Sequence, residues 1–166
     1  MQFLDAQQWE QLHHDYIAHG IRIGKERLVV SAAIVCDGKI LLVRRSEEDS
    51  YAGSWEFPGG GVDEDEMLVE AIKREVQEET GIELPDHPIA EVLTHTTSTA
   101  LRVVVQYELP EVPKVRLSHE HDAYQFFDKN QLKRNNEADM ELFETLRPEN
   151  QAVVRLLLEP SLGREL

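Results

Sequence analysis

Residues 59–82 read GGGVDEDEMLVEAIKREVQEETGI, a glycine-rich turn followed by a segment with helical periodicity. Glu75, Glu78 and Glu79 lie near the end of that segment, and Gly81 is placed to end the helix. At about 100° per residue, the three glutamates fall within an arc of about 100° on the helix surface. Three clustered carboxylates after a glycine turn indicate a divalent-metal site that serves phosphate chemistry.

An apolar stripe on the same helix predicts how the carboxylates are presented. Val69, Ile72 and Val76 share a face that would pack on the core, with the glutamates on its flank. Like charges at this spacing destabilise a helix by roughly 0.2–0.5 kcal/mol per pair. The helix dipole also disfavours negative charge in the last turn. Local stability therefore does not explain the three glutamates, whereas a bound cation does.

The composition is that of an ordinary globular protein. The chain has 166 residues, of which 41% are hydrophobic and 30% charged, which is enough for one domain with a sizeable core. The net charge of −15 argues against nucleic acid or an anionic membrane as a partner. The same charge would repel an anionic substrate, so a cation-dependent site is favoured again.

The single cysteine and the apolar runs indicate a compartment. Cys36 can form no internal disulfide, and a buried place in a strand explains it better than catalysis. The N-terminal residues lack the basic-then-apolar pattern of a signal peptide. The longest apolar run, around residues 28–36, is too short to span a bilayer. These features predict a cytoplasmic protein.

The N-terminal segment, residues 3–19, predicts an amphipathic helix with Asp5 as its N-cap and Gly20 as its end. Its apolar residues at near-helical spacing are Leu4, Trp9, Leu12 and Tyr16. His13 and His14 are assigned to its polar side. The apolar side packs either on its own domain or on a second subunit, so a homodimer is one of two interpretations.

A change of pattern after this helix predicts a hairpin. Residues 28–36 form a strand of the fully buried kind, an Asp-Gly pair at 37–38 is a strong turn signal, and residues 39–45 form the returning strand. Successive side chains alternate across a strand, so Arg44 and Arg45 point to opposite faces. One arginine would be solvated, and the other can reach a substrate phosphate.

The stretch WEFPGGG, residues 55–61, predicts a short strand that delivers the glycine turn. Glu56 alternates with two aromatic residues, and Pro58 ends the strand. Aromatic residues in strands usually belong to the core, but four are candidates for stacking on a nucleobase: Trp55, Phe57, Tyr124 and Phe126.

The remaining elements complete a fold class. Asp63, Glu64 and Asp65 suit the N-terminus of a helix expected over residues 65–80. Further elements are strands over 89–95, 101–109 and 123–127, a loop over 111–122, a helical turn over 128–132, and helices over 138–147 and 149–158 divided at Pro148. This order predicts the α/β class, of the α+β type, with a mixed sheet sandwiched between helices. No linker marks a second domain, so residues 1–166 are expected to form one.

The central stretch resembles the signature of the Nudix hydrolases. Every constrained position of that signature is matched, by Gly60, Glu66, Arg74, Glu75, Val76, Glu78, Glu79, Gly81 and Ile82. WEFPGG before the signature and SHEHDAYQFF after it extend the resemblance over roughly residues 28–132. The N-terminal helix, within residues 1–20, lies outside it, and the C-terminal helices, within 136–160, match only in kind.

The resemblance implies a metal-dependent mechanism. Mg²⁺ or Mn²⁺ would be held by Glu75, Glu78, Glu79, the Gly59 carbonyl and Glu120. Arg74, paired with Glu70 or Glu78 four residues away, would hold a ligand in place. The residues that support the signature would be Gly60, Glu66 and Gly81. Glu78 and Glu120 are both candidates for the base that takes a proton from the attacking water, and the number of metal ions stays open.

The implied reaction is hydrolysis of a nucleoside diphosphate linked to another group, X. The WEFPGG entry and the small size favour a nucleoside triphosphate, normal or oxidised, cleaved to the monophosphate and pyrophosphate. ADP-ribose, other nucleotide sugars and dinucleoside polyphosphates stay open, because the signature does not read X.

Two alternatives involve other functions. A non-catalytic Nudix-fold domain that binds nucleotides or regulates is one, although such domains usually lose glutamates of the signature and this chain keeps all of them. An isomerase of isoprenoid diphosphates is the other. It would need further catalytic cysteine and glutamate positions, and Cys36 lies in an apolar strand before the signature.

Overall fold

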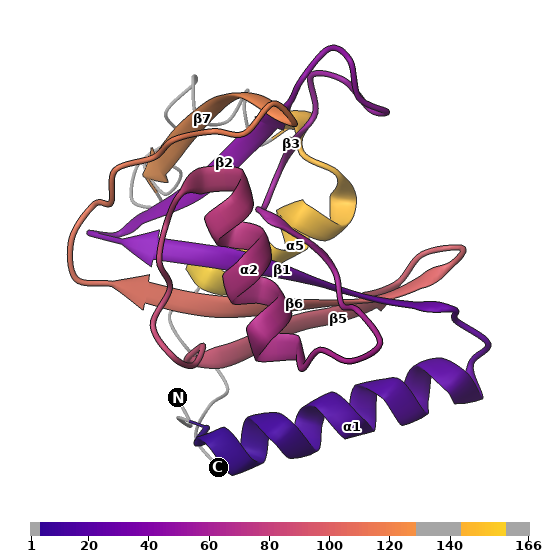
Figure 1. The fold of residues 1–166 in the computed structure, drawn as a ribbon. Helices are drawn as coiled ribbons and strands as arrows, with labels where there is room; N and C mark the ends of the chain where they lie inside the picture. The colour runs from indigo at the N-terminus through magenta and orange to yellow at the C-terminus, as the bar shows by residue number, and fades with distance from the viewer. Residues whose placement is uncertain (1–3, 129–143, 159–166) are drawn as a thin grey trace.

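The computed structural model describes residues 4–128 and 144–158. Its helices are α1 (Ala6–Arg22), α2 (Leu68–Thr80) and α5 (Pro148–Leu158). Its strands are β1 (Arg27–Cys36), β2 (Lys39–Arg45), β3 (Trp55–Glu56), β4 (Gly59–Gly61), β5 (Ala90–Thr96), β6 (Ala100–Leu109) and β7 (His121–Asp128). The strands form one sheet with the main order β3-β2-β1-β6-β5, while β4 pairs with β1 and β7 with β2 (Figure 1).

Strand β1 lies at the centre of this sheet. Every residue after Arg27 is buried, as expected for the apolar run. The strand pairs in parallel with β6 along its whole length and antiparallel with β2 and β4, so the sheet is mixed. The turn into β2 uses Asp37 and Gly38, whose φ angles of 48° and 71° are those that a tight hairpin of this twist requires.

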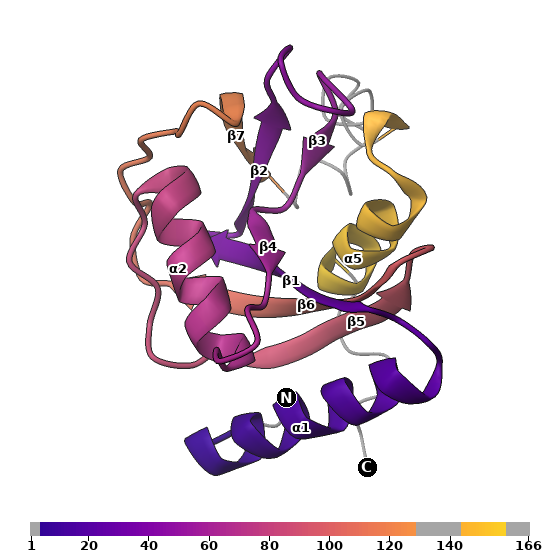
Figure 2. The same ribbon diagram turned by 45° about the vertical axis from the view of Figure 1, so that its right-hand side comes forward.

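Helices α2 and α5 cover opposite faces of the sheet (Figure 2). Ile72 and Val76 of α2 belong to a buried cluster with apolar residues of β1 and β6. Val153 and Val154 of α5 belong to a second cluster, on the other face, that includes Phe127 of β7. The predicted fold class, a mixed sheet between helices, is confirmed.

Helix α1 begins as expected and ends later. Gln8 N–H donates to the Asp5 carboxylate at 2.9 Å, and Asp5 N–H donates to the Gln8 side chain at 2.8 Å. The prediction that Gly20 ends the helix is wrong, because the helix continues to Arg22. Gly20 is buried instead, and a Cβ added there would meet Leu101 of β6 at 4.0 Å, an ordinary van der Waals contact. Trp9 is 2% exposed and its indole N–H donates to the Pro88 carbonyl at 3.2 Å, so its own subunit explains its burial.

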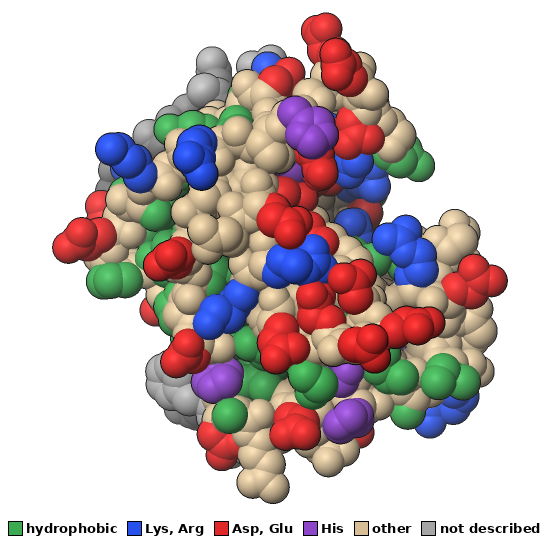
Figure 3. All heavy atoms as spheres, in the orientation of Figure 1, with side chains coloured by type: hydrophobic (Ala, Val, Ile, Leu, Met, Phe, Trp, Pro, Cys, Tyr) green, Lys and Arg blue, Asp and Glu red, His purple; other side chains and the backbone are tan. Residues whose placement is uncertain are grey.

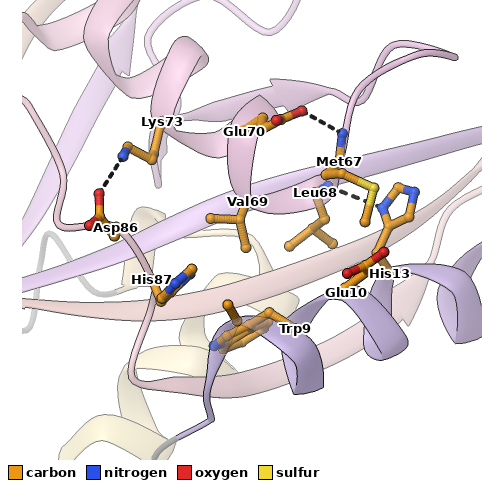
Figure 4. Close-up of a pocket in the computed structure, with 11 residues that line it drawn as sticks. Trp9, Glu10, His13, Met67, Leu68, Val69, Glu70, Lys73, Asp86 and His87 are labelled. Carbon is orange, nitrogen blue, oxygen red and sulfur yellow. Dashed lines mark hydrogen bonds and ion pairs between the residues drawn. The ribbon is translucent and has the colours of Figure 1, made fainter.

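His13 corrects a second prediction. It does not lie on the polar side of α1, because it is only 8% exposed and its Nδ1 accepts the backbone N–H of Leu68 at 3.0 Å. The bond satisfies a free N–H at the start of α2, in the manner of an N-cap supplied by another helix. Figure 4 shows this contact in the groove between α1 and α2, which has a volume of about 560 Å³.

The start of α2 also differs from the expectation. The helix begins at Leu68 and not near Asp65, so the three acidic residues at 63–65 are not its caps. Glu70 accepts the backbone N–H of Met67 at 3.1 Å and works with His13 at this end. The predicted end is correct: Gly81 has a φ of 72°, and its N–H donates to the Gln77 carbonyl.

Most other boundaries agree with the expectation within two residues. Strand β7 begins at His121, so the loop before it ends earlier than expected. Helix α5 begins at Pro148, which suits the first turn of a helix because its nitrogen has no proton to donate. The expected helical turn over 128–132 and the helix over 138–147 fall mostly outside the described residues. No helix in the two described ranges is both long enough and apolar enough to cross a bilayer.

Candidate functional site

The stretch expected as a glycine turn, and called so below, is the short strand β4, which lies close against the backbone of β1. Gly59 and Gly60 pair with Ser31 and Val30, and a Cβ on Gly59 would lie 2.1 Å from the Val30 carbonyl oxygen. A Cβ on Gly60 would lie 2.5 Å from the carboxyl carbon of Glu75. Glycine at position 59 therefore lets the segment lie against the sheet, and glycine at position 60 leaves room for the carboxylate of α2.

Glu79 is the buried member of the three helical glutamates. It is 5% exposed, and its carboxylate accepts the backbone N–H of Gly59 at 3.0 Å. Burial raises the pKa of Glu79 to about 8, although the hydrogen bond from Gly59 acts in the opposite direction. The nearby carboxylates of Glu120, Glu75 and Glu56 raise this pKa further. A buried acid that is surrounded by other acids is the environment that a cation would relieve.

Arg74 holds Glu75 from the side. Its guanidinium donates to Glu66 through Nε at 2.8 Å and Nη2 at 2.9 Å, and to the Gly61 carbonyl at 3.1 Å. It also donates to Glu75 at 2.8 Å, and Glu78 lies 3.5 Å away. The carboxylates of Glu66 and Glu75 raise the pKa of Arg74, although burial acts in the opposite direction. Of the two partners expected four residues away, only Glu78 is in contact, because Glu70 caps the start of α2.

Glu78 and Glu120 are more exposed. The Glu78 side chain is 60% exposed, and Glu120 lies in the loop immediately before β7. Among the residues that the structure describes, no three carboxyl, imidazole or thiol groups converge closely enough to hold a metal ion. Arg74 occupies one oxygen of Glu75 and Gly59 N–H occupies one of Glu79, so both carboxylates have competing partners.

The glycine segment and three of these glutamates line a cleft of about 540 Å³ that carries both signs of charge. Arg74 and Glu78 are not among its lining residues. Its acidic lining residues are Glu56, Glu75, Glu79 and Glu120, and its basic ones are Arg27, Arg45, Arg102 and Arg147. Figure 3 shows acidic and basic side chains gathered around a hollow in the surface. In a chain of net charge −15, four arginines in one cleft are a local concentration of positive charge beside the carboxylates.

The four expected substrate-binding residues divide into two pairs. Arg45 and Phe57 line the cleft, whereas Arg44 and Trp55 are not among its lining residues. Arg45 bonds Asp49 at 2.7 Å and Glu56 at 3.3 Å. Arg44 lies on the other face of β2, as the alternation requires, where it bonds Asp122 at 2.7 Å and lies over the Trp55 ring.

Several lining residues were not identified from the sequence. Glu56 is one: burial alone would raise its pKa, but His121, at 3.0 Å, and Arg45 hold it below its usual value. Arg102 is another, and burial lowers its pKa. Arg102 is the only charged residue in the strand segment ALRVVVQY, a signal that could have marked it. Tyr51 and Arg147 carry no such signal, since they lie in loops.

A comparison with protein families matches residues 25–146 to the NUDIX domain. The chain belongs to the Nudix hydrolase family. This match confirms the resemblance noted in the sequence. It also confirms the predicted enzyme class, a Nudix hydrolase that acts on phosphoric anhydrides. Nudix hydrolases generally use divalent metal ions.

Individual relatives agree on the family and differ in the substrates they are named for. A CTP pyrophosphohydrolase of Escherichia coli is 39% identical over 98 residues, which cover 57% of this chain and 70% of that protein. An 8-oxo-dGTP diphosphatase of Proteus vulgaris is 32% identical over 73 residues, which cover 43% of this chain and 65% of that protein. The crystal structure of a MutT protein from Methanosarcina mazei has a TM-score of 0.60 at 29% identity and covers 78% of this chain and 91% of that one.

Proposed function

We propose that this Nudix hydrolase cleaves a nucleoside triphosphate, normal or oxidised, to the monophosphate and pyrophosphate. The observation that carries the proposal is the cleft itself, in which arginines line the same space as the carboxylates of α2 and the glycine turn. A polyphosphate needs both, because arginines bind phosphate oxygens and carboxylates can recruit a cation. Relatives named for CTP and 8-oxo-dGTP support a triphosphate over other linked diphosphates.

Mg²⁺ or Mn²⁺ is the proposed cofactor, because the donors that surround the cleft are oxygen atoms. Glu79 also passes a test of fit, since its carboxyl group is buried, crowded by other acids and raised in pKa, as a group that awaits a cation should be. The residues that would hold the ion are Glu75, Glu78, Glu79, Glu120 and the Gly59 carbonyl. When bound, such an ion offsets the charge of the diphosphate and lowers the pKa of a coordinated water.

The remaining roles belong to side chains of this chain. Arg74 orients Glu75 through its short contact and is itself fixed by the two-pronged bond to Glu66. Glu78 or Glu120 takes the proton of the attacking water, since both are exposed carboxylates. Glu120 lines the cleft, and Glu78 lies beside Arg74. Arg45 faces the same space and binds phosphate oxygens. A cytoplasmic location and a homodimer stay predictions.

A substrate screen tests the proposal. Purified protein is incubated with Mg²⁺ and each of four classes of compound: nucleoside triphosphates, 8-oxo-dGTP, nucleotide sugars including ADP-ribose, and dinucleoside polyphosphates. Inorganic pyrophosphatase is added so that released pyrophosphate is read as phosphate. Chromatography then identifies the nucleotide product.

We expect the highest kcat/KM for a triphosphate, with the monophosphate as product and no turnover in excess EDTA. Preference for a nucleotide sugar or a dinucleoside polyphosphate would contradict the proposed substrate but not the proposed reaction, hydrolysis of a linked diphosphate. Absence of turnover in all four classes would favour a nucleotide-binding domain without catalysis.

A further inference from the structure

Tyr51 has an unusual position at the rim of the cleft. It lies in the loop between β2 and β3, lines the cleft and is nevertheless 69% exposed. Its φ angle is 63°, in the left-handed region that a bulky residue other than glycine rarely occupies. Neither its burial nor its backbone conformation therefore explains a tyrosine at this position.

The loop is built to keep Tyr51 in this conformation. The Tyr51 carbonyl accepts two hydrogen bonds from Ser54, one from its backbone N–H at 3.2 Å and one from its hydroxyl at 2.7 Å. The N–H of Gly53 donates to the Arg45 carbonyl at 2.9 Å and fixes the base of the loop. Strained residues that the surroundings hold so firmly cluster at functional sites, where the strain serves a placement.

Arg147, the residue just before α5, contacts the same aromatic ring. Its guanidinium carbon lies 4.2 Å from the centre of the Tyr51 ring. Its backbone carbonyl accepts the N–H of Gln151, and the adjacent Leu146 is buried, so the start of α5 anchors it. Within the described residues, no carboxylate lies within ion-pair distance of Arg147 or of Arg102, which lines the same cleft. Two guanidinium groups and an exposed ring thus face the space that the substrate would enter.

We propose that Tyr51 and Arg147 form a stacking platform for the base of the nucleotide substrate. Bases stack on aromatic rings and on guanidinium planes with little regard to their identity, since every base has a π face. The platform and the carboxylates line one cleft, so a bound nucleotide can place its base on the platform and its phosphates near Glu75 and Glu79. The inference rests on the proposed function. It adds the residues that bind the base, the part of the nucleotide that does not react.

Variants at position 51 separate binding from stability. Tyr51→Gly and Tyr51→Asn remove the ring, and both residues tolerate the left-handed conformation. Tyr51→Phe keeps the ring and serves as the matched control. Arg147→Gln removes the guanidinium from the ring. The kinetic measurements are KM and kcat for CTP and 8-oxo-dGTP. Calorimetry gives the dissociation constants of CMP, GMP and pyrophosphate, the last of which has no base, and thermal unfolding gives the midpoint temperature.

For Tyr51→Gly, Tyr51→Asn and Arg147→Gln we expect KM and the dissociation constants of CMP and GMP to rise about 10-fold or more. The pyrophosphate constant should stay unchanged, and Tyr51→Phe should behave as the wild type. The midpoint temperature of the glycine and asparagine variants should stay level or rise, because the backbone strain is relieved, whereas a residue that only stabilised the fold would lower it.

Two results would overturn the inference. One is an unchanged affinity for CMP and GMP in all three variants. The other is an equal loss of affinity for pyrophosphate, which would show that the effect does not depend on the base. Both outcomes are read from binding, which needs no turnover, so they are decided even if the screen finds no hydrolysis. Turnover with unchanged affinities in the variants would contradict the stacking platform and leave the proposed function standing.

Discussion

The backbone N–H of Gly59 donates to the carboxylate of Glu79 over 3.0 Å and joins the start of the glycine turn to the last turn of α2. The two residues are 20 positions apart, and each is constrained on its own: Gly59 by the carbonyl of Val30, and Glu79 by burial. The contact brings the turn and the carboxylates together as one unit. A small change in the backbone of the glycine turn should therefore shift the positions of the acidic side chains of α2.

Gly60→Ala tests this coupling. The added Cβ would lie 2.5 Å from the Glu75 carboxyl carbon, so the flexible end of Glu75 must move while the backbone can stay. We expect kcat/KM to fall about 10- to 100-fold, because such displacements are costly in an active site, with little change in unfolding temperature. Gly61→Ala is the control, since its Cβ would meet only the far end of Arg27 at 3.3 Å. Equal effects of the two variants would contradict the prediction.

Arg74→Lys tests the role of the guanidinium fork. Lysine keeps the charge but cannot bind Glu66 with two parallel bonds and Glu75 at the same time. The Glu75 carboxylate should then be less well oriented, so we expect kcat to fall about 10- to 100-fold. Lys73→Arg is the control at the neighbouring position. Lys73 pairs with the exposed Asp86, so this variant should leave kcat intact. A full kcat in Arg74→Lys would show that charge alone suffices.

Glu78→Gln tests the exposed carboxylate. Whether Glu78 is a ligand or the base, its loss should lower kcat by several orders of magnitude, on the order of 10²–10⁴-fold, while the fold stays intact. Glu70→Gln is the matched control, because it lies on the same helix and the amide oxygen can still accept from Met67 N–H. Near-normal turnover by Glu78→Gln in the presence of Mg²⁺ would remove Glu78 from the proposed site.

Glu79→Gln should separate stability from metal binding. The amide oxygen can still accept from Gly59, while the buried charge is removed. Just above about pH 8 the wild-type carboxyl is ionised, so the variant should unfold at a higher temperature in EDTA. Each kcal/mol corresponds to about 2–4 °C for a domain of this size. Added Mn²⁺ should stabilise the wild type and not the variant. A Mn²⁺ response as large as that of the wild type would mean that Glu79 is no ligand.

His13 predicts a dependence of stability on pH. Burial and the neighbouring His14 lower the pKa of His13 from 6.5, while Glu70 raises it. Below pH 6.5 the unfolded chain therefore binds a proton that the folded chain resists, so the free energy of unfolding should fall as the pH drops through this range.

A substitution at position 13 checks the same contact. His13→Gln should remove this part of the pH dependence and cost about 0.5–2 kcal/mol at neutral pH through the weakened cap of α2. His119→Gln, at an exposed position in the loop before β7, is the control. Urea titrations of the three proteins between pH 5 and 8 provide the measurement. Parallel curves for the wild type and His13→Gln would contradict the assignment.

Much of the fold could be predicted because the signals are local. Alternation and turn chemistry place β1, the Asp37-Gly38 turn and β2 within one residue of their observed bounds. Errors arose where a distant residue supplied the decisive contact. Asp65 was expected to begin the helix, but the start of α2 moved to Leu68, where His13 from another helix accepts its N–H. Gly20 was expected to end α1, but the helix continues to Arg22 and Gly20 is buried.

The sequence by itself determined that Glu75, Glu78 and Glu79 share one flank of a helix, since the period of a helix follows from the backbone alone. The same spacing carries the resemblance to the Nudix hydrolases, and the family match over residues 25–146 confirmed it. Only the tertiary structure decided that Glu79 is buried while Glu78 is exposed, and that Glu56, Arg102 and Arg147 face the same cleft. The reason is that strand register and loop path bring together residues with no periodic relation in the chain. These non-local contacts, and not the helical pattern, place the proposed base-stacking residues in the same cleft as the carboxylates.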